Sequence, residues 1–427
     1  MRPPLVRLPD GTVNQVSPIT GTVVWTVPGR AHRPVAAPVG PSEPVAPGAE
    51  RALCAFCEDR RLETPPEKER LVAGTGEVLR HVPASEVAAT SAEFRRIPNL
   101  FEIISVGYWR ANHGWRVPAA VRERAISYAA EPEGRAHLLA VARRRAPEMT
   151  DAEWAALPEA ERLARADDLF AGSHDVVVAR RHLVEGATRT DQLAASGTLT
   201  VDEHRRYVDF TVRAAGALYR EQPHARYVSV FQNWLRPAGA SFDHLHKQLV
   251  AIDEYGPQLE REIARMADDP DLFDREVLAY AEHEGLVIAR NEGAVAVAGV
   301  GHRYPAVEVY ATGPKVVPWE SPDVGAVADL LHAMHAATGA GVATNEEWHY
   351  RPPGVGVAMP WRVVLKWRVS NPAGFEGGTK IYVNTIDPWT MRARLVARLY
   401  ALRDAGAIAP VEIGDEITPL GTPSVFR

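Results

Sequence analysis

The apolar positions of the chain change repeatedly between the spacing of a strand and that of a helix. Residues 174–182 hold a short apolar run that is typical of a buried strand. Residues 200–222 carry apolar side chains at helical spacing behind a capping box, which predicts an amphipathic helix. Residues 226–234 and the stretch that ends at Ile252 predict two further strands around a loop. The order in this part of the chain is therefore strand, helix, strand, strand.

The second half of the chain repeats this order. Residues 306–312 predict a strand, and residues 321–339 predict a helix with a serine cap, a proline in its first turn and a closing glycine. Residues 361–369 supply the matching strand, and a last helix is expected over about residues 387–406. The repetition favours a duplication over two unrelated domains.

The predicted fold class is α+β, with two fused halves that each combine an antiparallel sheet with helices. The first half covers residues 1–255 and the second covers residues 256–427. Residues 115–170 are rich in alanine, arginine and glutamate at helical spacing, with a possible capping box from Thr150 to Glu153. We interpret this segment as a helical insertion in the first half.

Polar side chains occupy every second position in one of the predicted strands. His244, His246 and Gln248 follow a turn that contains glycine and serine. Side chains two apart in an extended strand point to the same face, so these three are expected to share one surface while Leu245 and Lys247 take the other. When the second half is aligned on the first, Val364 and Lys366 take the places of the two histidines.

Composition and charge describe a globular protein without a nucleic-acid partner. Hydrophobic residues make up 46% of the 427 residues, charged residues make up 24%, and the formal net charge is -6. No apolar run is long enough to span a membrane, and the first residues lack the apolar core of a secretory signal. We therefore expect a cytoplasmic protein with no membrane partner, and anionic small molecules remain compatible with its arginines.

The only two cysteines of the chain, Cys54 and Cys57, belong to one Cys-Ala-Phe-Cys tetrapeptide. A single close pair cannot build a framework of structural disulfides, which leaves metal binding, a reversible dithiol or chance. Zinc takes thiolate and imidazole ligands in a tetrahedral site, often beginning with such a turn. His244 is a candidate third ligand, and His182 is a candidate fourth.

One of the two alternating histidines can act as a nucleophile. A neutral imidazole is nucleophilic near neutral pH and can carry a phosphoryl group covalently. The alternative is that both histidines are simply hydrogen-bonded strand residues, half exposed to solvent. His113, His204 and His349 are equally compatible with ordinary surface or core positions.

The motif around these histidines resembles the galactose-1-phosphate uridylyltransferase branch of the histidine-triad superfamily. The family pattern of Phe, Glu, Asn, then Gly-x-Ser and His-Pro-His-Gly-Gln matches this chain in spacing at seven positions: Phe231, Asn233, Gly239, Ser241, His244, His246 and Gln248. The Cys-Ala-Phe-Cys turn, the segment around Asn99 and the strand ending at His182 resemble further family blocks in the same order. The similarity covers most of the chain apart from the helical insertion.

The resemblance implies a ping-pong transfer in which His246 carries the nucleotide covalently. By this resemblance His246 attacks the α-phosphorus of a nucleotide sugar, Gln248 binds the non-bridging phosphate oxygens, and a sugar phosphate then accepts the nucleotidyl group. The residues expected around the nucleotide and its phosphates are Arg30, Arg33, Asn99, Asn233, Gly239, Ser241 and Gln248. The ligands expected for one structural zinc ion are Cys54, Cys57, His182 and His244.

The chain departs from the family pattern at several positions. Lys247 stands in place of a glycine, Leu245 in place of a proline and Gln232 in place of a glutamate. The family's second metal site uses a histidine pair where this chain has Val364 and Lys366, so we expect that site to be absent. The residues after Glu376 also differ from those expected to contact a hexose.

The sequence therefore predicts a nucleotidyltransferase that moves a nucleoside monophosphate, UMP by default, between a nucleotide sugar and a sugar phosphate. A nucleotide phosphorylase or hydrolase of the same superfamily is the first alternative. A catalytically inactive protein that binds zinc and nucleotides is the second. The resemblance also implies a homodimer.

Overall fold

The structure is a computed structural model that describes residues 3–29, 42–314, 316–369 and 372–418. Its centre is a twelve-stranded sheet in the order β16-β10-β11-β12-β14-β13-β8-β9-β7-β6-β4-β5, in which every pairing is antiparallel. Its strands are β4 (Glu69–Val72), β5 (Val78–Arg80), β6 (Ala92–Pro98), β7 (His174–Ala179), β8 (Tyr227–Trp234), β9 (His246–Ile252), β10 (Val287–Arg290), β11 (Ala294–Ala298), β12 (Ala306–Ala311), β13 (Thr344–His349), β14 (Arg362–Trp367) and β16 (Glu412–Ile413).

The two predicted repeats meet at the middle of this sheet. In the first repeat the strand before the helix is β7, and in the second it is β12. Strands β8 and β13, which follow these helices, pair with each other, and Asn233 lies directly opposite Asn345. The repeats are thus joined edge to edge by main-chain hydrogen bonds around an approximate twofold axis. The division of the chain at residue 255 stays a prediction.

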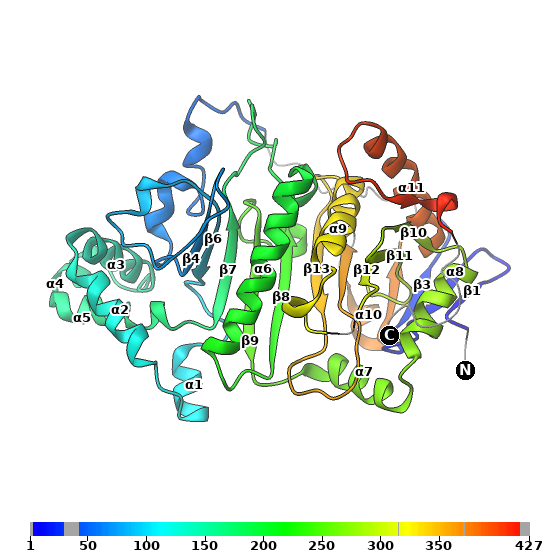
Figure 1. Cartoon of the computed structure of the whole chain (residues 1–427), viewed down its shortest axis with the longest axis horizontal. Helices are drawn as coiled ribbons and strands as arrows, with labels where there is room; N and C mark the ends of the chain where they lie inside the picture. Colours follow the sequence, from blue (N-terminus) through cyan, green and yellow to red (C-terminus); the bar gives the residue numbers. More distant parts are fainter. Residues whose placement is uncertain (1–2, 30–41, 315, 370–371, 419–427) are drawn as a thin grey trace.

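A smaller sheet combines both ends of the chain. It has the order β1-β2-β3-β15, and β15 pairs with β3 in parallel. Its strands are β1 (Leu5–Arg7), β2 (Val13–Val16), β3 (Val23–Thr26) and β15 (Ile381–Asn384). In Figure 1 this sheet lies beside the second repeat, far from the helical insertion.

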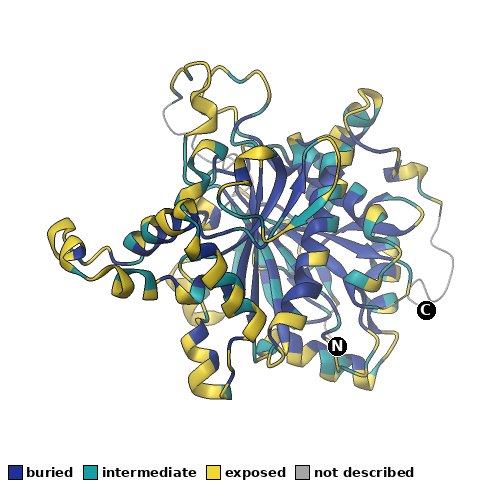
Figure 2. Cartoon of the chain, turned by 60° about the vertical axis from the view of Figure 1, so that its left-hand side comes forward, coloured by how far each residue is buried: buried dark blue, intermediate teal, exposed yellow. Residues whose placement is uncertain are grey.

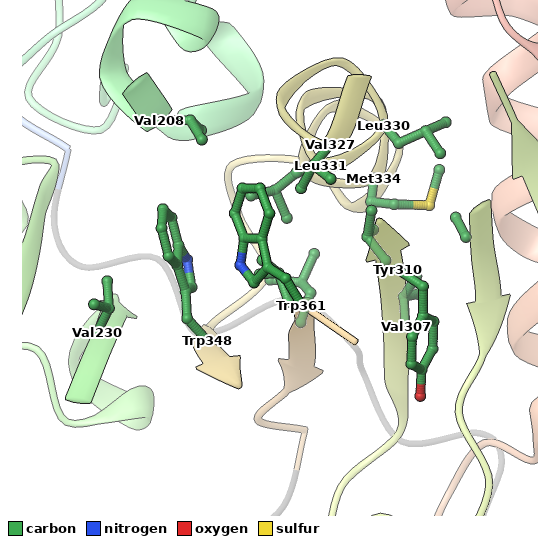
Figure 3. Close-up of a cluster of buried hydrophobic side chains, with 14 of the residues drawn as sticks. Val208, Val230, Val307, Tyr310, Val327, Leu330, Leu331, Met334, Trp348 and Trp361 are labelled. Carbon is green, nitrogen blue, oxygen red and sulfur yellow. The ribbon is translucent and has the colours of Figure 1, made fainter. Parts of the chain in front are cut away.

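Helices α6, α9 and α11 cover one face of the large sheet (Figure 1). Their side chains and those of the strands beneath form one core, in which Val208 of α6, Leu331 of α9 and Trp348 of β13 lie together (Figure 3). The helices are α1 (Val106–His113), α2 (Ala119–Ala130), α3 (Pro132–Arg144), α4 (Asp151–Ala156), α5 (Glu159–Ala164), α6 (Val201–Glu221), α7 (Gly256–Asp268), α8 (Tyr280–His283), α9 (Val324–Thr338), α10 (Gly374–Thr379) and α11 (Pro388–Asp404). None of the described helices is long and apolar enough to cross a membrane.

The predicted ends of the helices are correct except at one terminus. Thr200 caps α6 through the backbone N–H of Glu203, as the sequence predicts. The predicted serine cap of α9 is wrong, because the hydroxyl of Ser321 accepts from the N–H of Asp323 and the helix begins only at Val324. Pro322 therefore lies before the helix and not in its first turn.

The helical insertion has its own small core and a largely exposed surface. Helices α2 to α5 gather beside the β4–β6 edge, where their outer faces are exposed (Figure 2). Their buried residues form a separate cluster around Tyr128, Val141 and Trp154. The insertion therefore adds to the first repeat without entering the main core.

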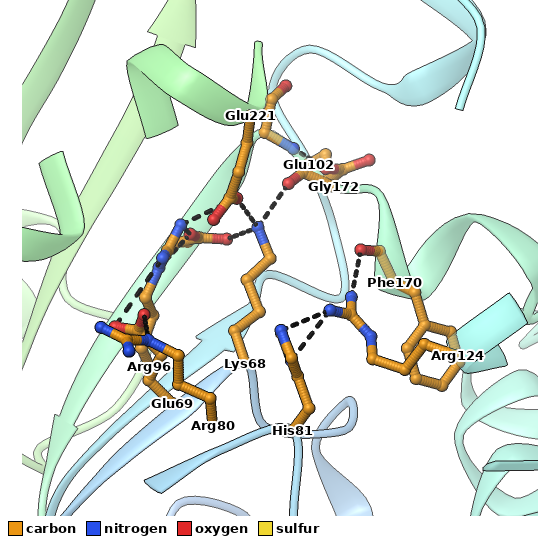
Figure 4. A network of polar contacts seen from close by, with 12 residues as sticks. Lys68, Glu69, Arg80, His81, Arg96, Glu102, Arg124, Phe170, Gly172 and Glu221 are labelled. Carbon is orange, nitrogen blue, oxygen red and sulfur yellow. Dashed lines mark hydrogen bonds and ion pairs between the residues drawn. The ribbon is translucent and has the colours of Figure 1, made fainter. Parts of the chain in front are cut away.

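A buried ion network fixes β7 to the end of α6 (Figure 4). Asp175 accepts from Arg96 at 2.6 Å and lies 2.8 Å from the ammonium of Lys68. Glu221, in the last turn of α6, is 2.9 Å from both cations. Asp175 and Arg96 are fully inaccessible to solvent, so each charge depends on its partners. The network positions the strand that begins with His174.

Candidate active site and metal centre

His246 and Gln248 lie on the face of the sheet that α6 and α9 leave open. In the register of β7 and β9, His246 pairs with Val178 and Gln248 pairs with Val176. Between them, Lys247 points to the helix side and is completely buried. The alternation predicted for this strand is confirmed from His246 onward, whereas His244 lies in a bend just before the strand.

The structure brings the four predicted metal ligands together. The turn of Cys54 and Cys57 is closed by a backbone hydrogen bond of 3.0 Å, and their sulfurs are 3.8 Å apart. Nδ1 of His244 is 3.5 Å from the Cys54 sulfur, and Nδ1 of His182 is 3.5 Å from the Cys57 sulfur. All four ligand atoms lie within 4.8 Å of one another.

These distances fit a tetrahedral zinc site. With Zn–S bonds of about 2.3 Å and Zn–N bonds of about 2.0–2.1 Å, the edges of a tetrahedron are about 3.8 Å between two sulfurs and about 3.6 Å between sulfur and nitrogen. The observed separations lie close to these values. The neighbouring Cys54 thiol and then the imidazoles lower the pKa of Cys57, which favours the thiolate that a metal requires. The donor set and its geometry are therefore suited to one zinc ion.

Backbone carbonyls fix which nitrogen of each histidine is available. Nε2–H of His244 donates to the carbonyl of Ala179 at 2.6 Å, so its Nδ1 is the unprotonated atom that faces the sulfurs. Nδ1–H of His246 donates to the carbonyl of His244 at 2.7 Å, so its Nε2 carries the lone pair. The two rings thus present opposite nitrogens, one to the cysteines and one to the open face.

His246 lies in a largely apolar environment. Its side chain is 5% exposed, and the ring of Phe56, from the cysteine turn, has its centre 5.1 Å away. Phe56 in turn contacts Phe242 at 4.6 Å. This burial lowers the pKa of His246 to about 4, so the imidazole is neutral near neutral pH.

A third histidine, His174, orients Gln248. Nδ1 of His174 accepts from the backbone N–H of Ile103 at 3.2 Å, which leaves the proton on Nε2. Nε2–H then donates to Oε1 of Gln248 at 3.1 Å. Because its oxygen is occupied, the amide of Gln248 has its two N–H donors available for a ligand. Burial lowers the pKa of His174, which keeps it neutral in this role.

Sequence reasoning missed His174, although a signal was present. His174 begins the predicted strand 174–182, and side chains two apart in a strand point to the same face, so His174 shares a face with Val176. Val176 pairs with Gln248, so His174 and Gln248 lie on the same face of the sheet. The predicted site residue Asn99 lies beside it, with its side-chain amide 3.1 Å from the ring of His174. Asn99 and Gln248 therefore both lie next to His174, and the sequence predicts that both contact the nucleotide or its phosphates.

Three further predicted site residues, Asn233, Gly239 and Ser241, lie at the end of β8 or in the loop between β8 and β9. Oδ1 of Asn233 accepts from the amide of Asn345 at 2.7 Å. Gly239 has a φ of 88°, a left-handed conformation that favours glycine, and it ends a short turn next to Asn233. Ser241 is exposed. Arg30 and Arg33 lie outside the described residues.

The departures at Lys247 and Gln232 are linked in the structure. The ammonium of Lys247 is 3.1 Å from Oε1 of Gln232 and 2.5 Å from Oε1 of Glu346. Glu346 also accepts from Nε2 of His335 and from the indole of Trp348. The carboxylate that neutralises Lys247 thus comes from Glu346 of the second repeat. Gln232 is neutral, so Lys247 does not also have to balance the glutamate that the family has at this position.

In the second repeat, the positions expected for a further metal site have other contacts. Lys366 lies in an ion pair with Glu347 at 2.6 Å. His349 is 3.6 Å from the same carboxylate, and Val364 is buried. Among the described residues, the Cys54 cluster is the one group of metal-ligating side chains that meets the geometric requirement.

A family model described as a domain of unknown function (DUF4921) matches residues 8–421. The chain belongs to the DUF4921 family. Among solved structures, this DUF4921 protein is similar to an ADP-glucose phosphorylase from Arabidopsis thaliana with bound ADP-glucose, with 18% identity, a TM-score of 0.57 and coverage of 90% of this chain and 97% of that chain. A GalT-like protein from Arabidopsis thaliana gives 18% identity, a TM-score of 0.55 and the same coverage. No curated protein sequence matches the chain.

The structural similarity establishes the fold of this DUF4921 protein. Both similar structures share its architecture over almost their whole length, although sequence identity is low. The predicted α+β class and the resemblance to the galactose-1-phosphate uridylyltransferase family are therefore confirmed at the level of fold. The fold by itself does not determine what the DUF4921 protein does.

Proposed function

We propose that this protein is a nucleotidyltransferase that acts on nucleotide sugars and carries the nucleotide on His246. The observation that supports this proposal most directly is the division of labour between two histidines. Nδ1–H of His246 is bound to the carbonyl of His244, which leaves Nε2 as a nucleophile beside Gln248, while Nδ1 of His244 is turned to the cysteines. A pair of ordinary hydrogen-bonded strand histidines does not require this opposite use of the ring nitrogens.

The transfer consists of two displacements at one phosphorus atom. Nε2 of His246 forms a bond to the α-phosphorus, the bond to the bridging oxygen breaks, and the sugar phosphate leaves with that electron pair. A phosphate oxygen of the acceptor then attacks the same phosphorus and releases the imidazole. During both steps negative charge spreads over the non-bridging oxygens, where the N–H donors of Gln248 stabilise it.

Zinc is proposed for the Cys54, Cys57, His182 and His244 cluster. Cys54, Cys57, His182 and His244 would hold the ion, which would supply structural support without taking part in the displacement. The cluster connects the cysteine turn to the bend before β9. It therefore holds the carbonyl of His244, which in turn orients the ring of His246.

Two nucleotide bases and two acceptors are compatible with the proposed transfer. Uridine follows from the family resemblance, whereas one similar structure contains ADP-glucose. The acceptor is proposed to be a sugar phosphate, and inorganic phosphate is the acceptor in the phosphorylase alternative. The homodimer and the cytoplasmic location stay predictions.

An exchange experiment tests the proposed function. Labelled glucose 1-phosphate is incubated with unlabelled UDP-glucose or ADP-glucose, because a covalent intermediate moves label into the nucleotide sugar without a second acceptor. Wild type should catalyse exchange with at least one base, and His246→Ala should reduce the rate by about a thousandfold or more. Parallel reactions with galactose 1-phosphate and inorganic phosphate identify the acceptor. Exchange at the wild-type rate in His246→Ala would refute the proposal.

A further inference from the structure

We propose that the second repeat binds a small sugar phosphate at a site separate from His246. A cavity of about 450 Å³ lies on the open face of β12, β13 and β14, and the loop of residues 17–22 borders it. This volume is within the usual range for small-molecule sites. Its lining includes Arg303, Tyr304, Asn345, Glu347, Lys366 and Arg368.

Internal symmetry gives this cavity the position of a second phosphate site. Lys366 pairs with Ala306 of β12, as His246 pairs with Val178 of β7. In the same alignment of the two repeats, Arg368 takes the place of Gln248, because each lies two residues after Lys366 or His246. Asn345 of β13 takes the place of Asn233 of β8. The nucleophile and its amide neighbour are thus replaced by two cations, which are suited to hold a phosphate but not to transfer it covalently as a neutral imidazole does.

The carboxylates around the cavity already have cationic or imidazole partners. Glu347 lies 2.6 Å from Lys366, Glu262 lies 2.6 Å from Arg362, and Glu308 lies 2.9 Å from His302. Glu276 contacts Arg275 at 3.0 Å. Lys366, Arg362 and Arg275 therefore balance three of these four carboxylates, and Arg362 also lies 3.9 Å from Glu308.

Among the described residues, no carboxylate pairs with two of the arginines in the lining. Within the described part of the chain, Arg303 contacts the hydroxyl of Tyr382 at 3.0 Å and lies over its ring at 4.7 Å. Arg368 donates to Oδ1 of Asn345 at 2.6 Å and lies over the ring of Tyr304 at 4.5 Å. Nε of Arg368 is buried without a hydrogen-bond partner. These two guanidinium groups supply unmatched positive charge for a phosphate.

The same cavity has the groups that bind sugar hydroxyls. A hydroxyl both donates and accepts, so it can satisfy a carboxylate and a guanidinium at once. Oε2 of Glu262 and Nη1 of Arg362 are buried polar atoms with no partner among the described residues, and Glu262 and Arg362 are 0% and 4% exposed. Glu347 and Asn345 add further acceptors on the same face. A phosphorylated sugar therefore satisfies both the charge and the polar atoms of the lining.

The proposed site is distinct from the active site. Gln248, Phe231, Glu347 and Val364 form one row across the four strands β9, β8, β13 and β14. Three strand spacings of about 4.8 Å separate the ends of this row by about 14 Å. A sugar phosphate bound near Lys366 and Arg368 is therefore held by other residues than one bound at His246.

The test uses calorimetric titration with glucose 1-phosphate. The protein is the double variant His246→Ala/Gln248→Ala, which lacks the nucleophile, so the result does not depend on whether nucleotidyl transfer takes place. We expect about one equivalent to bind, and adding Arg303→Gln and Arg368→Gln should weaken binding by about tenfold or more. Adding Arg213→Gln instead, an exposed arginine on α6, is the matched control and should leave binding unchanged.

Two further titrations separate the parts of the ligand and guard against misfolding. Glucose should bind far more weakly than glucose 1-phosphate, and inorganic phosphate should bind more weakly than the sugar phosphate. Thr20→Glu places a carboxylate at the border of the cavity without altering the arginines, and it should also weaken binding. Absence of binding to the double variant, binding that none of these substitutions alters, or equal affinity for glucose would overturn the proposal.

Discussion

At the scale of single residues, main-chain carbonyls decide what each histidine can do. His244 and His246 are two positions apart and chemically identical, yet one donates through Nε2 and the other through Nδ1. His174 uses the same principle, because a backbone N–H occupies its Nδ1 and directs Nε2 toward Gln248. Sequence alone predicts the histidine pair, but the choice of nitrogen depends on carbonyls that only the folded loop brings close.

The metal centre gives a prediction at this scale. Purified wild-type protein should contain about one zinc per chain by elemental analysis, because four ligands at tetrahedral separations are present. Cys54→Ser and His182→Asn should each lower the zinc content and the temperature of unfolding, since zinc binding contributes to folding. His224→Asn, at an exposed histidine outside the cluster, is the control. Zinc-free wild type, or unchanged zinc in Cys54→Ser, would contradict this assignment.

At the scale of elements, buried ion pairs hold the strands that carry the site. The network of Lys68, Arg96, Asp175 and Glu221 connects β7 to α6 (Figure 4). Lys247 and Glu346 connect β9 of the first repeat to β13 of the second, and both side chains are fully buried. Such pairs are costly to break singly, because removing one partner leaves the other charge buried without compensation.

Removing one member of the network tests this view. Asp175→Ala leaves Arg96 buried without its closest carboxylate, so the free energy of unfolding should fall by about 3–5 kcal/mol. Asp209→Ala breaks the exposed pair of Asp209 and Arg213 on α6 and should change the free energy of unfolding by less than about 1 kcal/mol. Urea denaturation followed by tryptophan fluorescence measures both. Equal effects of the two substitutions would show that burial does not decide the contribution.

Most elements could be predicted from the sequence, because their signals are local. The apolar periods place α6 and the strands β7, β8, β12 and β14 close to their observed positions. The start of α9 could not be predicted from the sequence. A serine hydroxyl can cap a helix or accept from the N–H two residues later, and Ser321 does the second, with Asp323. The parallel pairing of β15 with β3 was also out of reach, because it joins segments more than 350 residues apart. Cys54, Cys57, His182 and His244 were predicted as one cluster, whereas His174 depended on the register of β7 against β9.

At the scale of the whole molecule, the two repeats give the open face of the sheet two regions with different charges. The first repeat presents neutral imidazoles and an amide near His246. The second presents several paired carboxylates, among them Glu308, whose pKa is about 2. Burial alone would raise this pKa, but the opposing effects of His302, Arg362 and Tyr310 are larger in sum. The second repeat therefore depends on a buried carboxylate that is ionised in the folded state.

This carboxylate predicts how stability depends on pH. Its pKa in the folded state lies below the ordinary value of 4.5, so its contribution is present above about pH 4.5 and is lost as the pH falls toward 2. The free energy of unfolding of wild type should therefore fall relative to that of Glu308→Gln as the pH decreases across this window. The decrease should be on the order of 3 kcal/mol. Glu412→Gln, at an exposed position, is the control. A difference between wild type and Glu308→Gln that is constant from pH 5 to pH 2 would contradict the assignment.

The central claim is that the imidazole of His246 carries the nucleotide, and mass spectrometry of the trapped protein tests it most directly. Wild type is incubated with the nucleotide sugar that supports exchange, denatured in alkali and digested, and the modified peptide is sequenced. The account predicts one added nucleoside monophosphate, located on His246, and none in His246→Ala, while the control His224→Asn is labelled like wild type. A nucleotidyl group on any other residue, or turnover without a labelled histidine, would contradict the account.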